Sequence, residues 1–250
     1  MRRSRIFSSE SLGDRARVTL GGDRARYLTR VLRLPVGAEV TLFDGSGPEW
    51  PAVITRMGRD RVELALGETQ TPHRDSPLSL RLLQGVSRGE RMDYAVQKAT
   101  ELGVHSILPV LTRHGVVRLD GPQAEKKRRH WQDVAVSACE QSGRCRVPDV
   151  QRPAALTSVL AGLPQDGPRW RLDPAGEKPL GGDPAPRGQA IITVLIGPEG
   201  GFDEAEAEAA TSAGFAVRSL GPRVLRTETA AAAVMAVLQA RWGDLSSGGD

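Results

Sequence analysis

Two glycine-containing segments in the last third of the chain carry the residues most suited to chemistry. Residues 195–202 read LIGPEGGF, and residues 220–229 read LGPRVLRTET. Glycines let a ligand approach the backbone closely, and Glu199 and Arg226 add charged groups beside it. The two segments therefore predict a ligand-binding site.

The first segment lacks the spacing of a phosphate-binding loop. Neither G-x-x-x-x-G-K-[ST] nor G-x-G-x-x-G matches it, and the carboxylate of Glu199 would repel a phosphate. Acidic residues are frequent from 203 to 208, and no basic residue follows before Arg218. This argues against a nucleoside triphosphate and allows a cationic or neutral ligand. The alternative is a simple tight turn followed by a helix that Asp203 caps.

Both segments follow apolar runs that predict strands. Residues 190–196 are apolar except for Thr193, which is typical of a strand buried on both faces of a parallel sheet. Ligands of such sheets bind beyond the carboxyl ends of the strands, so we expect the site there. A second strand is predicted over 216–220. Helices are expected from the Asp203 capping box with Glu206 and over 227–242.

The remaining elements divide the chain into a β-rich start and an alternating α/β region. The start has predicted strands at 16–20, 39–43, 51–54 and 61–66 and a helix at 23–34, which suggests a small barrel. After a polar, proline-containing stretch, strands are predicted at 78–83, 106–111 and 169–172 and helices at 91–103 and 123–142. Residues 161–189, rich in Pro and Gly, are the least legible part.

Composition argues against a membrane-spanning, secreted, metal-binding or disulfide-bonded protein. The chain has 250 residues, a net charge of +4 and no apolar run long enough to cross a membrane. Its start lacks the apolar segment of a signal peptide, so a cytoplasmic location is expected. The two cysteines and scattered histidines predict neither a metal site nor a disulfide, and Cys139 is expected to be a buried thiol.

A basic run at the start of the 123–142 helix stands out. Lys126, Lys127, Arg128 and Arg129 lie where the helix dipole favours acids. A solvated helix face and contact with RNA phosphates are both compatible with this run.

Taken together, the motifs resemble the ribosomal RNA small-subunit methyltransferase E family, of the SPOUT class of S-adenosylmethionine-dependent enzymes. The two glycine-containing segments carry most of the resemblance. Further similar motifs are 31–33 (VLR), 42–46 (LFDGS), 87–92 (SRGERM), 97–104 (QKATELGV) and 139–144 (CEQSGR). The resemblance extends over nearly the whole chain.

The resemblance implies an α/β fold class with two domains. A small PUA-like β-barrel that binds RNA is expected at 1–70, a linker at 71–77, and a SPOUT methyltransferase domain with a C-terminal trefoil knot at 78–243. Residues 244–250 are expected to form a flexible tail. The resemblance also implies a homodimer that forms through the catalytic domain.

The implied activity is transfer of a methyl group from S-adenosylmethionine to N3 of a uridine in 16S ribosomal RNA, within the small subunit. The N3 proton must leave, and the resulting negative charge over O2 and O4 must be stabilised. The candidates for these tasks are Arg144, Glu199 and Arg226. Glu199 could instead contact the cofactor, and either arginine could be a structural anchor.

The remaining site residues also follow from the resemblance. The expected RNA contacts are Arg5, Arg30, Arg33, Arg88, Lys126 and Lys127. The expected cofactor-binding residues are Ile196, Gly197, Pro198, Glu199, Gly200, Gly201, Leu220, Gly221, Val224, Leu225, Arg226 and Thr229. For Thr229 and its neighbour Glu228, helix capping is an alternative.

Two other functions remain open from the sequence. A ribosome-associated RNA-binding protein without turnover would keep the barrel, but the two intact segments disfavour it. A methyltransferase of the same class acting on another RNA would share the loop chemistry and differ in substrate recognition.

Overall fold

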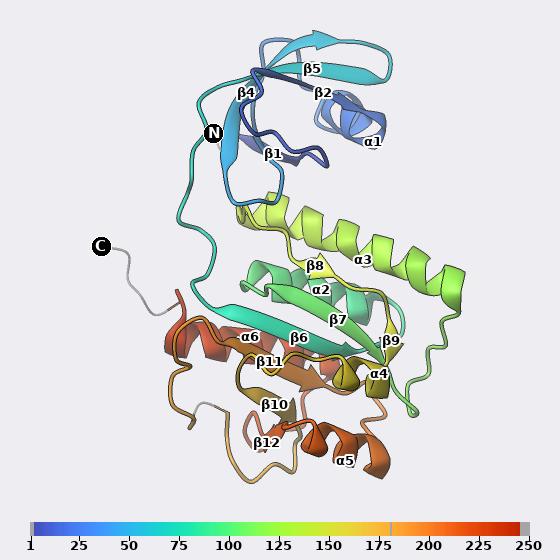
Figure 1. The fold of residues 1–250 in the computed structure, drawn as a ribbon. Coiled ribbons are helices and arrows are strands. Elements are labelled where there is room, and N and C mark those ends of the chain that lie inside the picture. Colours follow the sequence, from blue (N-terminus) through green and yellow to red (C-terminus); the bar gives the residue numbers. More distant parts are fainter. Residues whose placement is uncertain (1–2, 181, 246–250) are drawn as a thin grey trace. The chain divides into compact units, whose positions relative to one another are not determined.

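The computed structural model describes residues 3–180 and 182–245, which fall into two compact units (Figure 1). The first unit comprises Met1–Asp75 together with Cys139–Val147, and the second comprises Ser76–Ala138 and Pro148–Asp250. The boundary at Asp75 lies inside the predicted linker. The sequence did not predict that 139–147 would belong with the N-terminal unit. Most of the predicted tail, 246–250, lies outside the described residues.

The N-terminal unit is a curled five-stranded sheet in the order β1-β3-β4-β5-β2. Its strands are β1 (Ser4–Phe7), β2 (Arg17–Gly21), β3 (Glu39–Phe43), β4 (Glu49–Met57) and β5 (Arg61–Leu66). The pairs are antiparallel except for β1, which the sequence missed and which runs parallel to β3. A bulge in β4 between Ile54 and Arg56 disturbs the register, as expected where a sheet bends.

The predicted helix over 23–34 is in fact two short helical pieces. An α-helical turn, α1 (Gly22–Arg26), leads into a π-helical turn, η1 (Tyr27–Val31). Ala25 and Leu28 are buried against the sheet, so the predicted apolar spacing is correct. Just beyond η1, Arg33 has a φ of 51° and is the one non-glycine residue of the described chain in the left-handed region. Left-handed residues and π-helical turns both concentrate at functional sites.

A buried charge cluster joins the 139–147 segment to the N-terminal unit. The guanidinium of Arg5 pairs with Glu49 and donates to the carbonyl oxygen of Arg144 at 3.1 Å. Partial burial acts to raise the pKa of Glu49, but Arg5 and Arg74 outweigh it and lower that pKa. Because a buried ion pair is costly to break, this cluster holds the segment in place.

The C-terminal unit contains an all-parallel sheet in the order β12-β10-β11-β6-β7-β8, with β9 paired to β7 beside β8. Its strands are β6 (Ser79–Gly85), β7 (Ser106–Leu111), β8 (Asp149–Val150), β9 (Ala154–Ala155), β10 (Arg169–Leu172), β11 (Ile191–Ile196) and β12 (Ala216–Arg218). The helices are α2 (Glu90–Glu101), α3 (Gly121–Ser142), α4 (Leu156–Ala161), α5 (Glu204–Ser212) and α6 (Thr227–Trp242). The residues of α3 from Cys139 onward belong to the N-terminal unit.

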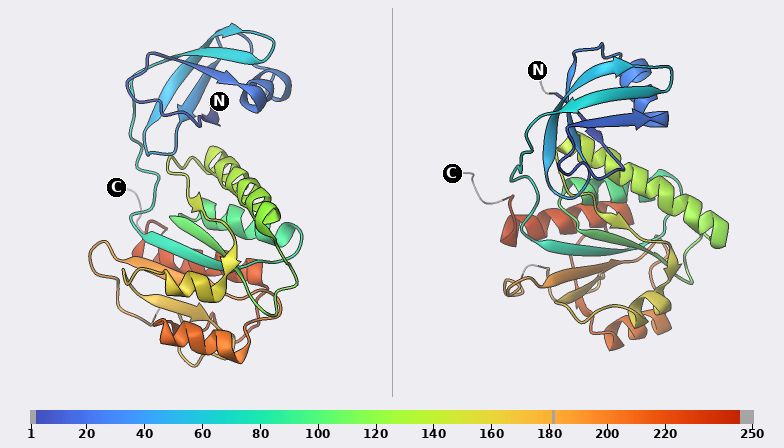
Figure 2. Two further views of the ribbon diagram at one scale, coloured as in Figure 1. Left: turned by 45° about the vertical axis from the view of Figure 1, so that its right-hand side comes forward. Right: turned by 45° about the horizontal axis from the view of Figure 1, so that its top comes forward.

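Helices cover both faces of this sheet (Figure 2). On one face, residues of α2, α3 and α6 pack against Leu82 and Val194, and on the other, residues of α4 and α5 pack against Leu83 and Leu195. The alternation of these strand residues between two cores confirms that β11 is buried on both faces.

The predicted helix boundaries in the last third are confirmed. Asp203 and Glu206 form the capping box of α5, and α6 spans Thr227–Trp242 as expected. The sequence missed the short helix α4 that precedes the 161–189 stretch. Among the described residues, no helix combines the length and the apolar character that a membrane span requires.

Candidate functional site

A cavity of about 620 Å³ lies at the carboxyl end of β11, where the sequence predicts the site. Its walls come from the loop after β10, the 196–202 segment and the 220–228 segment, with Arg91 of α2 at one edge. These loops follow β10, β11 and β12, three parallel strands joined side by side, so their carboxyl ends meet at one edge of the sheet. Ligands of such sheets bind at this edge.

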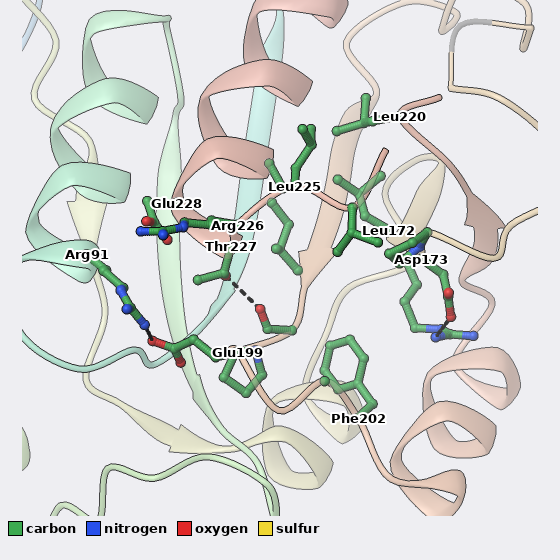
Figure 3. A pocket seen from close by; sticks show the side chains of 18 of the residues that line it. Arg91, Leu172, Asp173, Glu199, Phe202, Leu220, Leu225, Arg226, Thr227 and Glu228 are labelled. Carbon is green, nitrogen blue, oxygen red and sulfur yellow. Dashed lines mark hydrogen bonds and ion pairs between the residues drawn. The ribbon is translucent and has the colours of Figure 1, made fainter. Parts of the chain in front are cut away.

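The hydroxyl of Thr227 holds the two glycine-containing segments together. It donates to the carbonyl oxygen of Gly197 at 2.7 Å (Figure 3). It also accepts from the side-chain amide of Gln84 at 2.8 Å. Thr227 and Gln84 are both buried. Two polar groups shielded from water thus satisfy each other and fix the start of α6 against the ends of β6 and β11.

Gly85 allows the end of β6 to approach the 196–202 segment. A Cβ atom at this position would lie 2.3 Å from the backbone nitrogen of Pro198, so no other residue fits without a shift. Gly201 serves another purpose, since its φ is 68° and a Cβ there would meet nothing within 4 Å. Glycine is needed at position 201 because of this backbone conformation, and not because a side chain would clash with neighbouring atoms.

The cavity is lined by apolar and charged side chains. In Figure 3, Leu172, Leu220 and Phe202 lie on the side of the loop after β10, together with Asp173. Arg91, Glu199, Arg226 and Glu228 lie toward α2. The guanidinium carbon of Arg171 lies 6.0 Å from the centroid of the Phe202 ring, and the Arg171 side chain pairs with Asp173 at 2.9 Å. A mixed lining of this kind is typical of small-molecule sites.

Glu199 is held as an anion. Its carboxylate forms an ion pair of 2.5 Å with Arg91 of α2. Partial burial acts to raise the pKa of Glu199, but its own backbone amide, Arg91 and the backbone amide of Arg88 outweigh this effect and lower the pKa. Glu199 therefore braces the 196–202 segment against the start of α2 and is poorly suited to accept a proton.

Glu228 has a different environment. It lies in the first turn of α6 and lines the cavity. Its Oε2 is shielded from solvent and finds no hydrogen-bond donor among residues 3–180 and 182–245. The N-cap of α6 is Arg226, whose side chain makes no capping hydrogen bond. An unpartnered buried polar atom usually costs about 1–3 kcal/mol, and more for a charged group.

Most of the predicted cofactor-binding residues come together around the cavity. Gly200, Gly221 and Thr229 do not line it, and Gly200 instead packs against His114, to whose backbone oxygen a Cβ would come within 2.8 Å. The predicted residues that do line it are Ile196, Gly197, Pro198, Glu199, Gly201, Leu220, Val224, Leu225 and Arg226.

The residues predicted for catalysis fall in different places. Glu199 and Arg226 line the cavity, whereas Arg144 belongs to the N-terminal unit. Arg144 is buried there and pairs with Asp75 at 3.2 Å. This arrangement matches the structural-anchor alternative for Arg144.

The residues predicted to bind RNA differ in exposure. Arg5 is buried in its pair with Glu49, whereas Arg30, Arg33, Arg88, Lys126 and Lys127 are exposed. In the basic run, Arg128 and Arg129 both bond Glu125 and lower its pKa to about 2. The two lysines of that run are therefore its most available charges.

The sequence analysis missed several residues that line the cavity. Leu172 ends β10 and Asp173 follows it. The strand was predicted, but its place beside β11 was not visible in the sequence. Arg91 comes from α2, about a hundred residues before the segment it meets. A prediction of strand order would have found the first two, because neighbouring parallel strands end at the same edge.

The cysteines and the possible metal ligands of the described residues form no further candidate site. Cys139 and Cys145 are free and buried, and burial raises the pKa of the Cys139 thiol to about 12. Within the described residues, no group of three or more His, Cys, Asp or Glu side chains is arranged to hold a metal ion.

Comparison with known protein families identifies the class. Residues 74–239 match the family described as RNA methyltransferase domain, and residues 20–66 match the RNA methyltransferase PUA domain. The domains are thus those of an RNA methyltransferase with an N-terminal PUA domain.

Individual relatives narrow the class to one family. The ribosomal RNA small subunit methyltransferase E of Bacillus subtilis is 30% identical over 85% of each chain, and that of Mycobacterium bovis is 30% identical over 95% of this chain and 93% of its own. The crystal structure of this enzyme from Neisseria gonorrhoeae, bound to S-adenosylmethionine, has 36% identity and a TM-score of 0.90 over 98% of this chain and 100% of its own. The chain belongs to the ribosomal RNA small subunit methyltransferase E family.

The Arg91–Glu199 pair generates a titration prediction. Because the folded pKa of Glu199 is lowered, the pair's contribution to stability is present above the carboxyl's ordinary pKa and is lost as the pH falls through the lowered value. We expect Arg91→Gln to move the pKa of Glu199 upward, as measured by carbon-detected NMR of the labelled carboxyl. Arg88→Gln is the matched control, since only the Arg88 backbone contributes. If the pKa of Glu199 is unchanged in Arg91→Gln, the ion pair does not hold Glu199 as proposed.

Proposed function

We propose that this protein transfers a methyl group from S-adenosylmethionine to N3 of a uridine in 16S ribosomal RNA. The observation that carries the proposal is the cavity at the end of β11, because the two segments that form it also carry the motifs of the family. The enzyme name shared by the relatives and the cofactor bound in the Neisseria gonorrhoeae structure support it.

The residues present fit this cofactor. The cavity falls within the range of about 300–1,000 Å³ common for small-molecule sites. Leu172, Leu220, Leu225 and Phe202 offer apolar surface for an adenine ring, and the loop backbone of 196–201 offers hydrogen-bonding groups beside it. Asp173 and Glu199 are each paired with an arginine, and Glu228 is the lining carboxylate whose Oε2 has no donor among the described residues.

The chain contributes alignment and electrostatics to the reaction. S-adenosylmethionine, when bound, supplies an electrophilic methyl group on a positively charged sulfur. Arg226, exposed at the cavity, is placed to stabilise the negative charge that spreads over the uracil oxygens as N3 loses its proton. In this proposal Glu199 positions the loop through Arg91, and Arg144 anchors its segment through Asp75.

Recognition of the RNA is proposed for the N-terminal unit and for the exposed basic residues near the catalytic domain's helices. Arg30 and Arg33 flank the exposed Val31 at the end of η1, which gives phosphate-binding charge next to a small apolar surface. Arg88 and Lys126 with Lys127 are further candidates, whereas the burial of Arg5 favours a structural role. A 16S RNA substrate within the small subunit would place the protein's work in the cytoplasm.

The homodimer is also part of the proposal. Val224 lines the cavity and is 80% exposed, so it offers apolar surface that a second subunit would cover. We expect Val224→Glu to weaken self-association, as measured by sedimentation velocity over a range of concentrations. A wild-type protein that sediments as a monomer at every concentration while remaining active would rule the dimer out.

The decisive experiment maps methylated nucleosides in ribosomal RNA from cells with and without the protein. We expect one N3-methyluridine of 16S RNA to disappear with the protein and to return with wild type but not with Gly201→Val. A β-branched residue at a φ of 68° is strained by about 1–3 kcal/mol, so cofactor affinity should fall by roughly 5- to 150-fold in calorimetry.

Gly214→Val is the matched control for this variant. Gly214 has a φ of 86° and equally open surroundings, but it does not line the cavity. It should bind the cofactor normally. A methylated nucleoside lost from another RNA, and not from 16S RNA, would overturn the proposed substrate.

A second prediction concerns the RNA-binding face. Arg33→Glu should weaken RNA binding by roughly 10-fold or more and reduce the salt dependence of that binding, with unchanged affinity for the cofactor. Arg33→Gly removes the charge without the left-handed strain and should give the smaller loss of the two. The exposed Arg61→Glu on β5 is the control for charge alone. Equal RNA affinity of wild type and Arg33→Glu would show that this face does not bind RNA.

A further inference from the structure

The cavity is lined by three carboxylates, and their environments differ. Asp173 accepts from Arg171 at 2.9 Å and from the backbone nitrogen of Ala175 at 3.0 Å. Glu199 accepts from Arg91 at 2.5 Å. For Glu228, Oε2 has no donor within the described part of the chain and is closed off from water. When carboxylates in one site differ in this way, the one whose charge is least satisfied is the best proton acceptor.

The reaction proposed above requires such an acceptor. N3 of uracil carries a proton, and its lone pair becomes nucleophilic only as that proton leaves. Glu199 and Asp173 are already neutralised by arginines, so taking up a proton would break an ion pair in each case. Glu228 would lose no such partner.

We propose that Glu228 is the catalytic residue that accepts the N3 proton of the target uridine, an inference that rests on the proposed function. The N3–carbon bond forms as the sulfonium–carbon bond of the donor breaks, and the proton of N3 passes to the carboxylate of Glu228. The sulfonium loses its positive charge and leaves as a thioether, and the carboxylate of Glu228 loses its negative charge when it takes up the proton. The total charge is therefore unchanged. The proton then exchanges with solvent after the product departs.

The groups that surround Glu228 suit this role. The carboxylate lies in the first turn of α6, near the positive end of the helix dipole. Arg226 and Arg223 from the same segment and Arg91 from α2 line the same cavity and can stabilise the uracil oxygens. The other charged side chains of the lining are Glu199 on the loop after β11 and Arg171 and Asp173 on β10 and its loop.

Fixation of α6 makes the placement of Glu228 reproducible. Its neighbour Thr227 is bonded to Gly197 and Gln84, so the first turn of the helix cannot slide relative to the 196–202 segment. Figure 3 shows Glu228 on the same side of the cavity as Arg226 and Arg91. A base must be held near the proton that it accepts before the reaction begins. The two hydrogen bonds of Thr227 hold the first turn of α6 in place for this purpose.

The test compares wild type with Glu228→Gln, which keeps the shape of the side chain and removes its basicity. Cofactor affinity is measured by calorimetry, folding by thermal unfolding, and methyl transfer to small-subunit RNA in single turnovers from mildly acidic to alkaline pH. We expect unchanged cofactor affinity and a rate about 10²- to 10⁴-fold lower. The variant's rate should keep rising with pH, because hydroxide or ionisation of N3 must then replace the carboxylate.

A more acidic substrate separates a base from a merely structural residue. RNA transcribed with 5-fluorouridine in place of uridine has a more readily ionised N3, so it should restore the rate of Glu228→Gln far more than it raises that of wild type. Glu228→Asp, which keeps a carboxylate, should retain the wild-type pH profile at a lower rate. Glu204→Gln is the matched control, since Glu204 is an exposed glutamate in the first turn of α5.

Each outcome has a definite meaning. The inference is overturned if Glu228→Gln keeps the wild-type rate and pH profile, if it loses cofactor affinity as much as it loses rate, or if fluorinated RNA gives no selective rescue. Failure of wild type itself to methylate N3 of any uridine would instead overturn the proposed function, and the inference with it.

Discussion

The hydroxyl of Thr227 is the point on which the cavity depends. It joins three segments that are distant in sequence: the end of β6 through Gln84, the loop after β11 through Gly197, and the start of α6. Because Thr227 and Gln84 are both buried, loss of the hydroxyl would leave the Gln84 amide unsatisfied and free the helix start to move. Gly85, which lets Pro198 approach so closely, belongs to the same junction. The binding loops are thus fixed by a few short contacts at the carboxyl edge of the sheet.

Around this junction the protein separates carboxylates of one chemical type into different roles. Glu199 and Asp173 are each paired with an arginine and act as braces for their loops. Glu228 lacks such a pairing within the described residues, although it lies in the same cavity. The difference comes from neighbours that the fold supplies, since Arg91 reaches Glu199 from α2 and Arg171 reaches Asp173 from β10. The neighbours of each carboxylate, and not its residue type, therefore decide whether it has a structural or a chemical role.

Part of this description was available from the sequence alone. The apolar run of β11, the capping box at Asp203 and the extent of α6 follow from local rules of burial, capping and helix periodicity, and the structure confirms them. The motifs around Gly197 and Leu220 also pointed to the segments that form the cavity. These features can be predicted from the sequence because each depends on residues that are close together in the chain.

The tertiary structure decided what depends on partners far apart in the chain. Residues 139–147 join the N-terminal unit because Arg5 reaches the backbone of Arg144, and no local pattern encodes that contact. Arg5 looked like an exposed RNA contact, yet its pair with Glu49 is buried. The order of the parallel strands brought Leu172 and Asp173 into the cavity. Sequence determined which segments carry chemistry, whereas only the fold determined which charges are neutralised, because burial and pairing arise from contacts between distant residues.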